Sequence, residues 1–119
     1  MGKILILESN LMWSARLAKS VSACAFEPVI ATGIPTEHEC SIAIINLANY
    51  KSLESAKEDV SKLKASGCTV IGHAGHKEKP LFQVGEEAGC DLLVTNGELT
   101  WKIEKILKKL GTSSEGPQS

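Results

Sequence analysis

The feature that most constrains the fold is a continuous apolar run at residues 42–45, which is rich in β-branched side chains and ends abruptly at Asn46. An apolar run between polar residues is typical of a strand that is buried on both faces of a parallel sheet. Open α/β sheets place their working site at the carboxyl ends of such strands. Asn46 is therefore the first candidate for a functional residue.

Four other short apolar runs predict further strands, at residues 3–7, 29–32, 68–71 and 90–94. The run at 29–32 is closed by Gly33 and Pro35, and only residues 36–39 then separate it from the central strand. A crossover helix needs a dozen or so residues overall. We therefore expect a loop or a single turn there, so that the second helix of the fold is shortened or absent.

Apolar residues recur at helical spacing in the remaining segments, which predicts a helix between most pairs of strands. Thr95 followed by Glu98 predicts a capping box at the start of the last helix, and Gly111 is predicted to end that helix. Residues 72–79 are predicted to form a polar loop. The predicted helices cover residues 11–24, 53–66, 80–89 and 96–110.

This alternation of strands and helices predicts a three-layer, doubly wound α/β fold with a parallel five-stranded sheet of order 2-1-3-4-5. The chain of 119 residues suits one domain. We expect that domain to cover residues 1–111 and the polar residues 112–119 to form a disordered tail.

Composition excludes several classes of function. The net charge of −1 gives no reason to expect binding to nucleic acid or to an anionic membrane. No signal peptide is present, and no apolar stretch approaches the roughly 20 residues of a membrane span. The four cysteines lie far apart, as in proteins of reducing compartments. We therefore expect a cytoplasmic protein.

Four segments match short motifs of one family. They are Lys3-Ile-Leu-Ile-Leu-Glu-Ser9, Ile44-Ile-Asn-Leu47, Val70-Ile-Gly-His-Ala-Gly75 and Ala88-Gly-Cys-Asp-Leu-Leu-Val-Thr-Asn96. In order and spacing they resemble the first, third, fourth and fifth strands of a response-regulator receiver domain, although the last segment is one residue shorter. The resemblance implies the flavodoxin-like receiver fold and a role in two-component signal transduction.

The resemblance covers the framework but not the reactive residues. The family's phosphoacceptor falls on an asparagine here, and an amide cannot form the acyl phosphate that a carboxylate nucleophile forms. The family's lysine falls on a threonine, which offers no ammonium to a phosphoryl group. The resemblance thus implies a degenerate pseudo-receiver that is not an enzyme and uses no metal or cofactor. The family's two metal-binding acids fall on Glu8 and Ser9. Its phosphoacceptor falls on Asn46, its hydroxyl on Ala74 and its lysine on Thr95.

Asn46 and Glu8 each have two interpretations. Asn46 either contacts a ligand or caps the strand end with its own hydrogen bonds. Glu8 either binds a cation beside Asn46 or is solvated or bonded to backbone N–H groups. His73 and His76, in the predicted loop above the site, are candidates for contact with a small anion or a partner.

A metal site that joins these histidines to the cysteines is excluded by geometry. Cys40, Cys68 and Cys90 open the third, fourth and fifth strands, whereas the histidines follow the fourth. A five-residue strand separates its two ends by roughly 16 Å. Zinc ligands must all lie at about 2.0–2.3 Å from one ion. The cysteines are interpreted as small buried apolar side chains.

The resemblance also implies a partner-binding face around the fifth strand and the last helix. Leu92, Leu99 and Trp101 lie in this region, with Leu92 at the position of the family's switch aromatic. Trp101 either anchors a partner or packs under a neighbouring loop. Trp13 on the first helix is the competing anchor.

Two hypotheses follow. The first is a stand-alone pseudo-receiver that binds another signalling protein, namely a kinase, a regulator or an output protein. The second is a binder of a small molecule or anion, or a minor enzyme, that uses Glu8, Asn46, His73 and His76 at the strand ends. A deep pocket there favours the second and a filled one favours the first. A homodimer is compatible with either.

Overall fold

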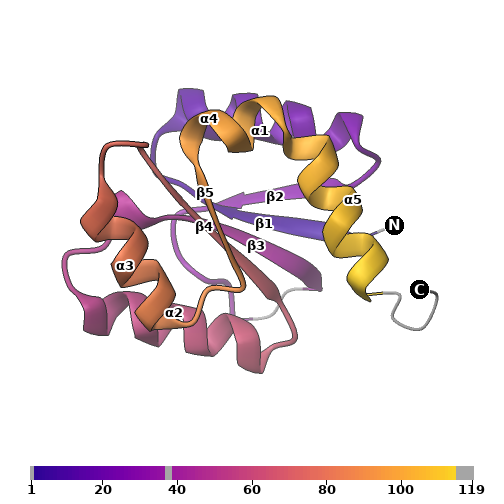
Figure 1. Cartoon of the computed structure of the whole chain (residues 1–119). Coiled ribbons are helices and arrows are strands. Elements are labelled where there is room, and N and C mark those ends of the chain that lie inside the picture. The colour runs from indigo at the N-terminus through magenta and orange to yellow at the C-terminus, as the bar shows by residue number, and fades with distance from the viewer. Residues whose placement is uncertain (1, 37–38, 115–119) are drawn as a thin grey trace.

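A single parallel sheet forms the centre of the molecule (Figure 1), with the strand order β2-β1-β3-β4-β5. The computed structural model describes residues 2–36 and 39–114. The predicted fold class and strand order are confirmed. The strands are β1 (Lys3–Leu7), β2 (Glu27–Ala31), β3 (Cys40–Asn46), β4 (Thr69–Ala74) and β5 (Leu92–Thr95).

Helices cover both faces of the sheet and complete three layers. Figure 1 shows α1, α4 and α5 on one face and α2 and α3 on the other. No helix of the described chain combines the length and apolar character needed to cross a bilayer. The helices are α1 (Leu11–Ala23), the 3-10 helix η1 (Leu47–Asn49), α2 (Leu53–Ala65), α3 (Lys79–Ala88), α4 (Asn96–Trp101) and α5 (Ile103–Ser114).

The central strand β3 divides the core into two halves, as its apolar run predicts. Ile42 and Ile44 pack with the residues of α1, α4 and α5, whereas Ala43 and Ile45 pack with those of α2 and α3. Successive strand residues point to opposite faces, so a strand with helices on both sides must be apolar throughout. Burying each isoleucine stabilises the fold by about 1.5–3 kcal/mol.

The connection between β2 and β3 contains no helix in its described residues, 32–36 and 39. The predicted shortening of the second crossover is thus confirmed for that part of the connection. Strand β2 pairs only with β1 and forms an edge of the sheet. An edge position tolerates Pro28, which lies within the strand although the pattern placed it before the strand.

The prediction of a polar loop over residues 72–79 is wrong for its first three residues. Strand β4 continues to Ala74, because it pairs with β3 and β5 on its two sides, through Asn46–His73 and Ala74–Thr95. Two neighbouring strands supply backbone hydrogen bonds that outweigh the low strand propensity of glycine and alanine.

The predicted end of the last helix is also wrong. The helical segment is interrupted at Lys102, and α5 then continues through Gly111 to Ser114. A glycine within a helix costs about 0.5–1 kcal/mol and does not by itself end it. Residues 112–114, predicted as disordered tail, are thus helical, whereas residues 115–119 lie outside the described part of the chain.

Gly85 provides a test of the packing between α3 and the sheet. A Cβ atom at this position would lie 2.6 Å from Leu93 Cδ2 and 2.9 Å from Leu47 Cδ1. We expect Gly85→Ala to destabilise the protein by about 1–3 kcal/mol through overpacking, which reverses the usual gain from replacing a helical glycine. Chemical denaturation measures the change. Gly97→Ala in α4 is the matched control, because a Cβ there meets nothing closer than 3.9 Å. Equal effects of the two substitutions would contradict this packing.

Candidate functional site

Three polar side chains lie next to one another at the carboxyl ends of neighbouring strands. Glu8 follows β1, Asn46 ends β3, and His73 lies in β4 opposite Asn46. By the alternation of strand residues, all three point to the face covered by α1, α4 and α5. The strand ends thus bring together three of the residues that the sequence singles out.

Glu8 and Asn46 are bonded directly to each other. The Asn46 Nδ2 donates to Glu8 Oε1 at 2.9 Å, and the backbone N–H of Asn10 donates to Glu8 Oε2 at 3.0 Å. Glu8 is only 3% exposed. The Asn46 Oδ1 in turn accepts from the backbone N–H of Ala48 at 3.0 Å and so caps η1. Both carboxylate oxygens of Glu8 and both polar atoms of Asn46 therefore have partners.

His73 is buried within the sheet layer and does not lie in a loop over the site. Its side chain is 2% exposed, and its ring stacks on Trp13 with centroids 5.0 Å apart and an interplanar angle of 9°. The Nδ1 atom lies 2.7 Å from Asn96 Oδ1. With an amide oxygen as partner, Nδ1 carries the proton of the neutral ring. The predicted contact of His73 with an anion or partner is wrong for this reason.

Burial also sets the protonation of His73. Desolvation lowers its pKa below the ordinary histidine value, while the hydrogen bond to Asn96 and the charge of Glu8 oppose this shift. The imidazole is therefore neutral at pH 7. Sequence patterns missed Asn96 and the stacking role of Trp13, because both contacts join residues far apart in the chain.

The remaining residues expected at the phosphoacceptor pocket are Ser9, Ala74 and Thr95. Ala74 is buried at the end of β4, and Ser9 is exposed. Thr95 forms the predicted capping box: its Oγ1 accepts from the Glu98 N–H at 3.0 Å, and its own N–H donates to Glu98 Oε1 at 2.8 Å. The hydroxyl of Thr95 is thus used to begin α4.

The three residues of the predicted partner face do not share one exposed surface. Leu99 is fully buried at 0% exposure and belongs to the core, so its assignment to this face is wrong. Leu92 is half-buried against the same core. Trp101 is 85% exposed, so it does not pack under a neighbouring loop. Trp13, the competing anchor, is half-buried against His73.

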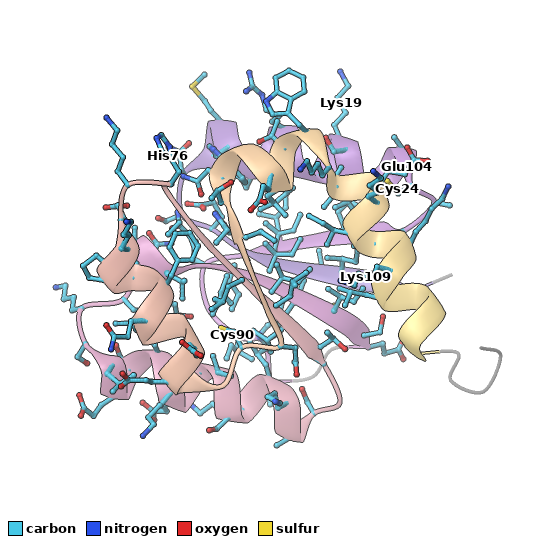
Figure 2. All side chains as sticks on the ribbon, in the orientation of Figure 1. Lys19, Cys24, His76, Cys90, Glu104 and Lys109 are labelled. Carbon is cyan, nitrogen blue, oxygen red and sulfur yellow. The ribbon has the colours of Figure 1, made fainter. Side chains whose placement is uncertain are left out.

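The cysteines and histidines lie at opposite edges of the sheet, as predicted. Cys68 precedes β4 and its thiol donates to the Cys40 carbonyl at 3.2 Å, whereas His73 lies near the other end of β4. Figure 2 shows the same separation between Cys90 and His76. Burial raises the pKa of the Cys90 thiol to about 11. In the described ranges, no three His, Cys, Asp or Glu side chains are grouped to hold a metal ion.

No protein-family model and no curated protein matches this sequence. Solved structures do match in fold. A receiver domain protein (CheY-like) from Methanospirillum hungatei JF-1 has a TM-score of 0.69 and 17% identity, over 98% of this chain and 99% of that chain. The Vibrio cholerae chemotaxis protein CheY4 has a TM-score of 0.73 and 12% identity, over 92% and 98%. The fold is that of receiver domains.

A third neighbour supports the same fold. It is a DNA-binding response regulator of the LuxR family from Staphylococcus aureus, with a TM-score of 0.72 and 16% identity over 92% of this chain and 98% of that chain. The strand-end residues described above therefore occupy the carboxyl edge of a receiver-type sheet.

The buried His73 predicts a pH dependence of stability. Because its folded pKa lies below the unfolded value of about 6.5, the stability that it contributes is complete above pH 6.5 and is lost as the pH falls toward the folded pKa. One such group changes the free energy of unfolding by at most about 1.4 kcal/mol per pH unit. Urea denaturation between pH 7 and pH 5 measures the slope.

We expect His73→Gln to flatten this slope, because glutamine does not titrate. His76→Gln, at an exposed position, is the control and should keep the slope of the parent protein. A slope that is unchanged by His73→Gln would show that His73 is not the titrating group.

Proposed function

We propose that the chain is a signalling module that binds another protein through the receiver fold and does not accept phosphate. The observation that carries this proposal is the hydrogen bond between Asn46 and Glu8. The motif resemblance puts Asn46 at the position of the family's phosphoacceptor, and the bond to Glu8 supports the proposal because the amide already has the neighbouring acid as its partner.

The chemistry of phosphorylation has no support from the other strand-end groups. A phosphoryl acceptor must be a nucleophile, and the Asn46 amide is not one. Magnesium ions in phosphate sites rest on one or two carboxylates and the phosphate oxygens. Glu8, the carboxylate bonded to Asn46, is buried and already accepts two hydrogen bonds. We therefore infer that the module performs no catalysis.

The surface around Trp101 is the proposed partner-binding site. Trp101 lies at the end of α4 and is among the few large apolar side chains that are exposed. Lys102, Lys105 and Lys108 lie beside it, and Lys108 pairs with Glu104 at 3.6 Å. An exposed aromatic side chain with charged neighbours is typical of an interface anchor. The partner is a kinase, a regulator or an output protein, or a second copy of the chain.

The alternative of a ligand site built from Glu8, Asn46, His73 and His76 is not favoured. Glu8 and Asn46 satisfy each other, and His73 is enclosed by Trp13 and Asn96. Among these four residues, His76 is exposed and Asn46 is partly exposed, whereas Glu8 and His73 are buried. The hydrogen bonds of Glu8, Asn46 and His73 are thus directed to one another and to neighbouring residues, which disfavours a ligand held by all four residues.

Restoring a carboxylate at position 46 tests the role of the amide. Asn46→Asp removes the donor to Glu8 and brings two carboxylates within hydrogen-bond distance. We expect a loss of about 1–3 kcal/mol in the free energy of unfolding at pH 7, measured by urea denaturation. Gln83→Glu on the exposed surface of α3 is the charge-matched control, expected within ±0.5 kcal/mol. An unchanged stability of Asn46→Asp would contradict the proposed dependence of Glu8 on the amide.

Partner capture tests the proposed function itself. We expect immobilised wild-type protein to retain a defined partner from the lysate of its source cells, and Trp101→Glu to lose it while the free energy of unfolding stays within about 1 kcal/mol. Ile30→Glu on β2 is the control, because Ile30 is also an exposed apolar residue but lies on the edge strand. Retention of the partner by Trp101→Glu would exclude this face, and a large loss of stability would show that Trp101 supports the core.

A further inference from the structure

A polar cleft lies beside α2, next to the connection that has no second crossover helix in its described residues. Its volume is about 380 Å³, within the range of small-molecule sites. The ends of β1 and β2 border it through Ser9 and Thr32, and η1 borders it through Asn49. No histidine lines this cleft, and Asn46 is not among its lining residues, whereas Glu8 forms part of its wall.

The far wall of the cleft carries a bonded tyrosine and carboxylate. The Tyr50 hydroxyl donates to Asp59 Oδ2 at 2.8 Å. Burial and this hydrogen bond both raise the pKa of Tyr50, so the phenol stays protonated and remains the donor. Asp59 lines the cleft and is half-buried, so a ligand in the cleft can approach its carboxylate. The half-buried ring of Tyr50 adds an apolar surface beside this carboxylate.

The charge of the cleft is negative. Its described lining contains two carboxylates, Asp59 and the buried Glu8, and no lysine, arginine or histidine. An anionic ligand would therefore meet repulsion without a compensating cation. A divalent metal ion is also disfavoured, because Glu8 is already bonded and a single carboxylate remains.

From this arrangement we propose that the cleft binds a small hydroxylated primary amine. The ammonium group donates to Asp59 Oδ1 and lies against the ring of Tyr50, an arrangement that favours cations. The hydroxyl groups of Ser9 and Thr32 and the amide of Asn49 bind the polar remainder of the ligand. The position agrees with the general rule that ligands of doubly wound sheets bind outside the carboxyl ends of the strands near the switch in strand order, here between β1 and β3.

Three probes of similar chain length test this proposal with the full-length chain. They are 4-aminobutanol, the neutral 1,4-butanediol and the anionic 4-hydroxybutyrate. We expect saturable amide NMR shifts of Thr32, Tyr50 and Asp59 with the amine alone. Asp59→Asn keeps an oxygen acceptor for Tyr50 and removes the charge, and we expect it to weaken amine binding by at least about tenfold.

Glu58→Gln is the matched control, because it removes the neighbouring charge on α2 without touching the described lining of the cleft. It should bind the amine as the parent protein does. Four outcomes would overturn the proposal: no saturable shift with the amine, equal shifts with 1,4-butanediol, equal weakening by Asp59→Asn and Glu58→Gln, or displacement of the amine by Mg²⁺. Binding of the amine is independent of partner capture through Trp101, so the two proposals fail separately.

Discussion

The buried carboxylate of Glu8 is the constraint on which the strand-end site depends. A charge that is 3% exposed destabilises the fold unless hydrogen-bond donors compensate for the lost water. The donors are the Asn46 amide from β3 and the Asn10 backbone N–H, which begins α1. A single side chain therefore ties two strands to the first helix. In the proposed function, an acidic residue at position 46 would remove the Asn46 donor and bring a second carboxylate next to Glu8.

A second set of contacts fixes the other half of the same edge. His73 on β4 stacks on Trp13 of α1 and is bonded to Asn96 at the start of α4. In the proposed function, the groups that would meet a phosphoryl group instead hold helices in place. Recognition is then left to the outer surface, where Trp101 is exposed. The two proposals thus use different surfaces: the α4 end for a protein partner, and the cleft beside α2 for an amine.

Much of the fold follows from local patterns, whereas the site depends on contacts between distant residues. Continuous apolar runs predicted the strands, and the short 36–39 segment predicted a connection without a helix, as found in its described residues 32–36 and 39. The sequence pattern placed His73 in a loop, because its neighbours, glycine and alanine, favour no strand. In the structure it is buried by contacts with Trp13 of α1 and Asn96 of α4, which lie far from it in the sequence. The error at Leu99 was avoidable. Residues two apart on a helix point about 200° from each other, so Leu99 and Trp101 cannot share one exposed face.

The most direct test of the central claim is a titration of Mg²⁺ and beryllofluoride, a phosphoryl mimic, into isotopically labelled protein, followed by amide NMR. If the Asn46–Glu8 bond replaces the phosphoacceptor site, the amide signals of Glu8, Asn46 and Ala74 stay in place at all concentrations of both ions. Saturable shifts of these signals would contradict the account and would show that the strand ends form a working phosphoryl-binding site.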